Sequence, residues 1–176
     1  MARHAIRERR LGPLIGLALD GGHEKMSKLR RARPIDYGSL EVHKLGGWIW
    51  QVHENQSYLG RMILRLSRPE MASLSHCTAD EWMSLQENIR SYEALLSELF
   101  SPDRFNYSQM GNIYPQLHVQ AVPRYAAKRT WRGRIFEDKN WGDNWAPTPR
   151  SPLSIEDTYE LAHWFATEIM TRVNKR

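Results

Sequence analysis

The stretch GNIYPQLHVQAVPRY, residues 111–125, holds one histidine in a short run where apolar and polar residues alternate. Alternate residues of a β-strand point to the same face, so the polar residues of this run are expected on one side and the apolar residues in the core. The polar residues are Gln116, His118 and Gln120. A Gly-Asn pair before the run favours a turn, and Pro123 predicts the end of the strand. The stretch therefore predicts a half-buried strand that presents a histidine between two glutamines.

Two further strands and a helix are predicted upstream of this stretch. Residues 48–52 and 58–66 are apolar runs typical of strands, and the residues between them include Asn and Ser, which favour a turn. Thr78 followed by Glu81 is the signature of a helix capping box, and apolar residues then recur at spacings of three and four. The apolar face of this predicted helix comprises Trp82, Leu85, Ile89, Tyr92, Leu95, Leu96 and Leu99.

The remainder of the chain adds a strand, a loop and a second helix. Residues 104–109 are predicted as a strand, and residues 126–150 as a loop rich in Trp, Pro and basic residues. Ser154 with Asp157 three residues later predicts the start of a C-terminal helix. Strands that follow one another, with a helix between hairpins, predict an α+β fold with an antiparallel sheet. The chain has no Gly-rich nucleotide-binding turn between a strand and a helix, which argues against a doubly wound fold.

A length of 176 residues is that of one domain with a tail. We expect a basic, loosely ordered extension over residues 1–45 and a folded domain over residues 46–176. Residues 1–34 carry nine Lys and Arg against three acidic residues, so the net charge of +5 is concentrated there. Such an extension could contact nucleic acid, but a solvated leader is the favoured interpretation.

Composition also bounds the setting of the protein. No apolar run approaches the roughly 20 residues that span a bilayer, so no membrane association is expected. Cys77 is the only cysteine, which excludes an internal disulfide and favours a reducing, cytoplasmic location.

The Gln-x-His-x-Gln pattern suits some chemistry and excludes other chemistry. Amide side chains are poor ligands for zinc, so neither a metal nor another cofactor is expected. An imidazole can attack phosphorus and hold a nucleotidyl group covalently, while flanking amides donate hydrogen bonds to the phosphate oxygens. A lone histidine on a strand is more often structural than catalytic, so the residues alone leave both interpretations open.

Residues 106–125 resemble the signature region of the histidine triad superfamily. That signature is His-φ-His-φ-His-φ-φ, where φ is apolar, and it commonly follows an Asn and a Gly-Asn turn, with Pro-Arg after it in many bacterial members. The segment YLGRMILRL, residues 58–66, resembles the family's Gly-His strand, and TADEWMSLQ, residues 78–86, its central helix. The resemblance covers roughly residues 45–150. It implies an antiparallel sheet of about five strands with a central helix, a nucleotide ligand and a homodimer.

The resemblance also implies roles for individual residues. His118 matches the nucleophile, which forms a nucleotidyl-histidine intermediate. The backbone carbonyl of Gln116 matches the group that holds the ring nitrogen that does not attack. Asn106, Gly111 and Asn112 match positions that line the nucleotide site.

Three positions depart from the family pattern. The first and third motif histidines are Gln116 and Gln120, and a Gln at the third position is also found in the galactose-1-phosphate uridylyltransferase branch. An amide cannot titrate, so this pattern favours transfer, or leaving groups as stable as polyphosphates. Arg61 stands where the family often has His; it either places a positive charge near phosphate or projects outward as a surface residue.

Trp131 lies in the basic and aromatic loop that follows the motif. It is expected to contact a base or a partner subunit if this loop is a lid over a polyphosphate. The alternative is a solvated loop that its Trp residues hold in place. Together these features predict a nucleotide-binding hydrolase or nucleotidyltransferase that acts on dinucleoside polyphosphates or nucleotide conjugates. The alternative is a nucleotide-binding protein with weakened catalysis; nucleic-acid binding led by the extension is not favoured.

Overall fold

The computed structural model describes residues 34–69, 73–112, 114 and 116–173. The folded unit spans Ile35–Arg176. Residues 1–33, which form most of the predicted basic extension, lie outside the described residues.

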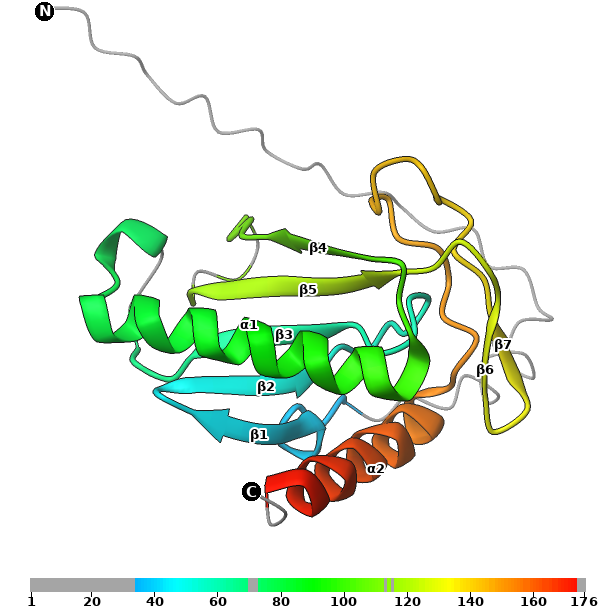
Figure 1. The fold of residues 1–176 in the computed structure, drawn as a ribbon, viewed down its shortest axis with the longest axis horizontal. Helices are drawn as coiled ribbons and strands as arrows, with labels where there is room; N and C mark the ends of the chain where they lie inside the picture. Colours follow the sequence, from blue (N-terminus) through cyan, green and yellow to red (C-terminus); the bar gives the residue numbers. More distant parts are fainter. Residues whose placement is uncertain (1–33, 70–72, 113, 115, 174–176) are drawn as a thin grey trace, which may run out of the picture. The chain divides into compact units, whose positions relative to one another are not determined.

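A five-stranded antiparallel sheet forms the centre of the fold, in the order β1-β2-β3-β5-β4 (Figure 1). The strands are β1 (Glu41–Leu45), β2 (Trp48–Val52), β3 (Met62–Leu66), β4 (Arg104–Ser108) and β5 (His118–Arg124). Two helices complete the main architecture: α1 (Ala79–Phe100) and α2 (Ile155–Val173). The predicted α+β class, with a central and a C-terminal helix, is confirmed.

The sheet begins inside the segment that the sequence assigned to the extension. A short 3-10 helix, η2 (Gly38–Leu40), leads into β1, and Leu40 is fully buried. β1 pairs with β2 across a tight turn at Gly46 and Gly47, both of which have positive φ angles. Because β1 is an edge strand and only half-buried, its sequence EVHKL lacks the apolar pattern that marks the other strands.

Helix α1 forms as its capping box predicts. The Thr78 hydroxyl accepts a hydrogen bond from the Glu81 amide at 3.2 Å, and the Glu81 carboxylate accepts one from the Thr78 amide at 2.8 Å. The helix ends at Phe100, and Ser101 caps it in a left-handed conformation with φ of 48°. Trp82 was predicted to face the core but is 46% exposed.

One face of the sheet packs against α1, which runs across it in Figure 1. The apolar residues of the opening stretch point to this side: Leu117 and Ala121 are fully buried and Val119 is 5% exposed, as predicted. Polar contacts fix the helix to the strands, since the Tyr92 hydroxyl donates to the backbone carbonyl oxygens of Gly60 and Ala121. The polar residues of β5 therefore point to the opposite face, which α1 does not cover.

Strand β5 runs through Pro123 to Arg124, so the prediction that Pro123 ends it is wrong. The Arg124 carbonyl accepts a hydrogen bond from the Asp103 amide on the β4 side, so the backbone of Pro123 faces the β3 side. β3 pairs with β5 only as far as Ala121. The missing N–H of proline therefore lies where the strand has no partner, which a sheet tolerates.

The segment 126–150, predicted as a loop, contains a hairpin. Its strands are β6 (Arg129–Trp131) and β7 (Arg134–Phe136), and they are joined by Arg132 and Gly133, both with positive φ. Strands of three residues are too short to show a period in the sequence.

Helix α2 starts with the predicted cap. The Ser154 hydroxyl accepts from the Asp157 amide at 3.1 Å, and the Asp157 carboxylate accepts from the Ser154 amide at 3.2 Å. The helix packs against β1 and η2 through buried residues that include Leu161 and Phe165. Among the described residues, no helix is long and apolar enough to cross a membrane.

Candidate functional site

A cavity of about 790 Å³ lies on the face of the sheet opposite α1. Side chains of β1, β2, β3 and β5 form its walls, together with the segments that contain Tyr37, His53, Gly111 and Trp145. The residues that matter here are His53, Arg61, Gly111, Asn112, His118, Gln120, Trp145 and Thr148. Five residues predicted to form the site are thus brought together: Arg61, Gly111, Asn112, His118 and Gln120.

His118 presents one ring nitrogen to this cavity. Its Nδ1 atom lies 2.7 Å from the backbone carbonyl oxygen of Gln116, which is the contact that the family resemblance implied. A carbonyl oxygen only accepts hydrogen bonds, so Nδ1 carries the proton in the neutral ring. The lone pair therefore resides on Nε2, the nitrogen that is free for a ligand or an electrophile.

Gln116 acts through its backbone. Its side-chain amide donates to the carbonyl oxygens of Leu66 and Arg68, each at 2.7 Å, and so joins the start of β5 to the end of β3. These bonds fix the carbonyl that holds the His118 ring. Gln116 therefore positions the histidine while its amide stays outside the cavity wall.

Arg61 points inward, which decides between the two orientations that the sequence left open. It is 4% exposed and lies just before β3. Its Nη2 donates to Oε1 of Gln120 at 2.9 Å, its Nη1 donates to the Thr148 hydroxyl at 3.3 Å, and its guanidinium carbon is 4.9 Å from the centre of the Trp145 ring. Burial lowers the pKa of Arg61 to about 10, so the side chain is cationic at neutral pH.

Three solved structures share this architecture. A histidine triad protein from Sinorhizobium meliloti matches with a TM-score of 0.57 at 22% identity, covering 75% of this chain and 87% of that one. One from Bradyrhizobium japonicum matches with a TM-score of 0.56 at 18% identity, covering 73% and 89%. One from Marinobacter aquaeolei has a TM-score of 0.51 at 18% identity, covering 74% and 88%. This chain has the histidine triad fold.

The likeness lies in the structure. No protein-family model and no curated protein matches the sequence. The predicted fold is nevertheless confirmed.

Asn106, which the resemblance implied at the nucleotide site, is not among the residues that line the cavity. It is on the same face of the histidine triad sheet as His118, but it is not part of the cavity wall. Its Oδ1 accepts a hydrogen bond from Arg124 at 2.7 Å. Arg124 also forms an ion pair with Asp138 at 2.6 Å, with 4% and 0% of the two side chains exposed. Asn106 thus belongs to a buried polar cluster beside the site.

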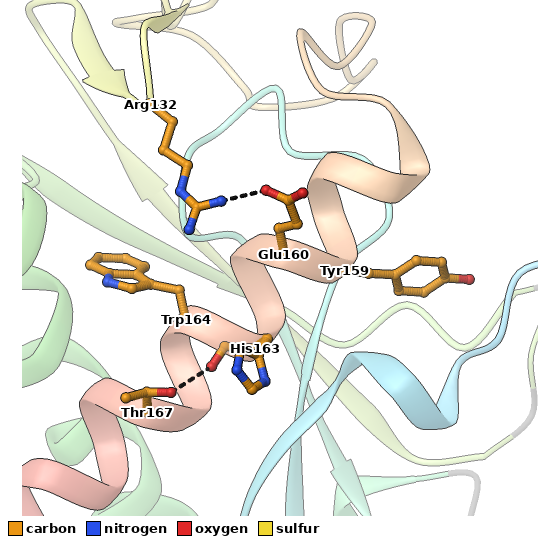
Figure 2. Close-up of a pocket in the computed structure, with 6 residues that line it drawn as sticks. All are labelled: Arg132, Tyr159, Glu160, His163, Trp164 and Thr167. Atoms are coloured by element: carbon orange, nitrogen blue, oxygen red, sulfur yellow. Dashed lines mark hydrogen bonds and ion pairs between the residues drawn. The ribbon is translucent and has the colours of Figure 1, made fainter.

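Trp131 and the basic residues around it do not form a lid over the cavity. Trp131 is 8% exposed and packs against Trp164 of α2. The other cations of this segment face protein carboxylates: Lys128 with Glu137, Arg129 with Asp103, Arg132 with Glu160, and Arg134 with Asp157. Figure 2 shows Arg132 and Glu160 at a shallow groove on α2, which is separate from the site. Tertiary packing thus buries Trp131 away from the cavity wall, which differs from its predicted place against a base or a partner subunit.

A different aromatic residue, Trp145, lines the site. The Tyr58 hydroxyl donates to the Trp145 carbonyl at 2.7 Å, and Asn140 donates to the Trp145 and Pro147 carbonyls at 3.3 and 3.2 Å. Asn55 donates to the Pro149 carbonyl at 2.9 Å. These side chains hold residues 145–149 along the cavity edge. The sequence signal was the Trp- and Pro-rich run WGDNWAPTP, but it did not indicate which Trp lines the cavity.

His53 is a second histidine in the wall that the sequence did not indicate. Its side chain is 13% exposed, and its Nδ1 accepts a hydrogen bond from the Asn55 amide at 2.9 Å. Burial, with smaller contributions from Arg61 and His118, lowers the pKa of His53 to about 3. The ring is therefore neutral at pH 7, and its contact with Glu54 at 3.3 Å is not an ion pair. With Nδ1 as acceptor, Nε2 carries the proton.

Neutral, buried His53 makes stability depend on pH. The folded pKa of about 3 lies below the ordinary 6.5, so as pH falls below 6.5 the unfolded chain binds a proton that the folded protein does not. We expect the free energy of unfolding to fall by up to about 1.4 kcal/mol per pH unit from pH 6.5 downward. Above pH 6.5, His53 should not change the free energy of unfolding with pH. Burial also lowers the pKa of His43, which adds a change of the same sign.

Urea unfolding at pH 6.5, 5.75 and 5.0 measures this dependence above the range where carboxylates titrate. In the variant His53→Gln, the slope of the free energy of unfolding against pH should be much smaller, and the remaining slope should be the part due to His43. Equal slopes in the two proteins would show that His53 is not held neutral.

The described residues contain no group of three or more His, Cys, Asp or Glu side chains that could hold a metal ion.

Proposed function

We propose that the protein binds a nucleotide in this cavity and acts as a hydrolase or nucleotidyltransferase through a nucleotidyl-His118 intermediate. One observation carries the proposal. The carbonyl of Gln116 holds the proton on Nδ1 of His118, which leaves the lone pair of Nε2 at the cavity. Family membership, which the histidine triad fold supports, is part of the same proposal.

In the first step, Nε2 attacks the α-phosphorus of the nucleotide. A P–N bond forms, the P–O bond to the leaving phosphate chain breaks, and its electron pair goes to the leaving oxygen. The ring then carries a positive charge, which the Gln116 carbonyl stabilises through the proton on Nδ1. In the second step, water or another hydroxyl attacks phosphorus, the P–N bond breaks and its electron pair returns to Nε2, while the proton of the acceptor is released to solvent.

The groups beside His118 indicate which leaving groups suit the site. Arg61 is a buried guanidinium bonded to Gln120, and Gln120 is a neutral amide where an imidazole would stand in the motif. Neither gives a proton to a leaving group at neutral pH. The site therefore favours dinucleoside polyphosphates, whose leaving group departs as a stable anion, over conjugates that release an amine.

A comparison of two substrates tests the proposed function. We expect release of AMP from diadenosine tetraphosphate with a kcat/KM about 10²-fold or more above that for adenosine 5′-phosphoramidate, because general-acid catalysis contributes roughly that factor. Chromatographic separation of the products measures both. Equal rates, or faster cleavage of the phosphoramidate, would contradict the assignment of the leaving group.

A second candidate function is nucleotide binding with little turnover. Replacement of two motif histidines by Gln116 and Gln120 favours it. Two measurements together distinguish the two functions: calorimetry with AMP and a turnover assay with diadenosine tetraphosphate. A binding protein gives a heat of binding with AMP and leaves diadenosine tetraphosphate intact.

Two further proposals concern the state of the protein. The resemblance implies a homodimer, which sedimentation of the full chain tests. A reducing, cytoplasmic location suits Cys77, a free and half-buried thiol.

A further inference from the structure

The contact between Arg61 and Gln120 fixes the orientation of the Gln120 amide relative to Arg61. A guanidinium group has only hydrogen-bond donors. The atom of Gln120 that lies 2.9 Å from Nη2 of Arg61 is therefore the carbonyl oxygen Oε1. The opposite arrangement would place two sets of N–H groups against each other.

The other end of the amide is then the NH2 group. Within the described part of the chain, Nε2 of Gln120 has no hydrogen-bond partner, and Gln120 lines the cavity two residues after His118 on the same face of β5. The amide thus presents two N–H donors beside the nucleophile. A phosphoryl oxygen accepts such bonds, whereas a carbonyl oxygen in the same place would repel it.

We infer that Arg61 is a positioning residue: it holds the Gln120 amide with Nε2 toward the cavity, where the NH2 group donates to the phosphoryl group that His118 receives. This inference rests on the proposed function and specifies how the site recognises phosphate.

Arg61 is itself firmly placed. Its backbone amide donates to the Tyr58 carbonyl at 2.9 Å, and its own carbonyl accepts from the buried Gln56 amide group at 2.7 Å. Gly60 precedes it with φ of 88°, and a Cβ there would lie 2.5 Å from Leu96 of α1. The backbone at Gly60 therefore lies in close contact with α1, one residue before Arg61.

One hydrogen-bond donor of the Arg61 guanidinium is left without a partner in the described part of the chain, as is found in some residues of functional sites. Its Nε is buried and has no hydrogen-bond partner among the described residues. An unpaired buried donor is unfavourable for the fold, so a purely structural role does not account for it.

A double-mutant cycle tests the inference. The variants are Arg61→Met, Gln120→Ala and the double variant, and the readout is the single-turnover rate of adduct formation with diadenosine tetraphosphate, with KM measured alongside. We expect each single change to slow the step by about 10²-fold, as for loss of one donor to a developing oxyanion, and the double variant to be no slower than the slower single one. Arg61→Lys, which keeps a donor for Oε1, should recover part of the rate. Multiplicative effects would show that Arg61 acts on substrate directly and would overturn the inference.

Gln120→Glu provides a matched control for the amide. It keeps an oxygen for Arg61 and replaces the NH2 group by a carboxylate oxygen. We expect adduct formation at least as slow as in Gln120→Ala, with thermal stability maintained. A wild-type rate in Gln120→Glu would mean that the N–H donors are not used.

A binding readout separates this inference from the proposed chemistry. On addition of AMP, the side-chain NH2 signals of Gln120 in a nitrogen–proton correlation spectrum should shift in the wild type and not in Arg61→Met. Equal shifts in both proteins would overturn the inference about Arg61 and leave the proposed function standing. Absence of AMP binding and of turnover in the wild type would overturn both proposals.

Discussion

Replacing His118 by alanine is expected to lower turnover of diadenosine tetraphosphate by about 10³-fold or more, because removal of a nucleophile leaves only the contribution of binding. The fold should persist. His118 is half-buried, and its hydrogen bond to the Gln116 carbonyl is worth only about 1 kcal/mol. Steady-state kinetics together with thermal unfolding separates the loss of chemistry from a loss of structure.

His163→Ala is the matched control for this change. His163 is exposed on α2, in the groove of Figure 2, and is not part of the cavity wall. Its replacement should leave turnover unchanged. Activity that survives in His118→Ala would contradict the assignment of the nucleophile.

Replacing Arg124 by methionine is expected to lower the free energy of unfolding by about 3–5 kcal/mol, because it leaves an uncompensated buried charge. That charge is on Asp138, whose side chain is fully buried against Arg124. Arg124 also donates to the carbonyl oxygens of Asn140 and Asp143, so the variant should loosen the segment that carries Trp145 and raise KM. Urea unfolding at pH 7 measures the first effect.

An exposed ion pair provides the comparison. Arg134 and Asp157 lie 3.5 Å apart, with 57% and 31% of their side chains exposed. Arg134→Met should cost at most about 1 kcal/mol, as is typical of surface pairs. If Arg124→Met were no more destabilising than Arg134→Met, the buried pair would not stabilise this side of the sheet.

The parts of the fold that sequence reasoning predicted depend on local patterns. Alternation on β5 placed His118 and Gln120 opposite the core, and the pairs Thr78–Glu81 and Ser154–Asp157 marked both helix starts. The features that sequence reasoning missed depend on which strands lie beside them in the folded sheet. The edge strand β1 is half-buried and has no apolar period, and Pro123 is tolerated only because β3 ends its pairing at Ala121.

The same division holds for the candidate site. Spacing placed His118 and Gln120 on one face of a strand, and the resemblance to the histidine triad family implied Gly111 and Asn112. Trp131 and Trp145 could not be told apart until tertiary packing buried one and placed the other beside Arg61. His53 was missed because a lone histidine after a strand has no distinctive spacing. Asn106 matched a motif position, but its amide oxygen is engaged by Arg124.

The covalent intermediate is the central claim, and intact mass spectrometry tests it directly. The protein is mixed briefly with diadenosine tetraphosphate and quenched at alkaline pH, because phosphohistidine is labile in acid. A mass increase of one adenylyl group in the wild type, and none in His118→Ala, is the predicted result. Release of AMP with no adduct at any time, including in a rapid quench during the first turnover, would contradict the account.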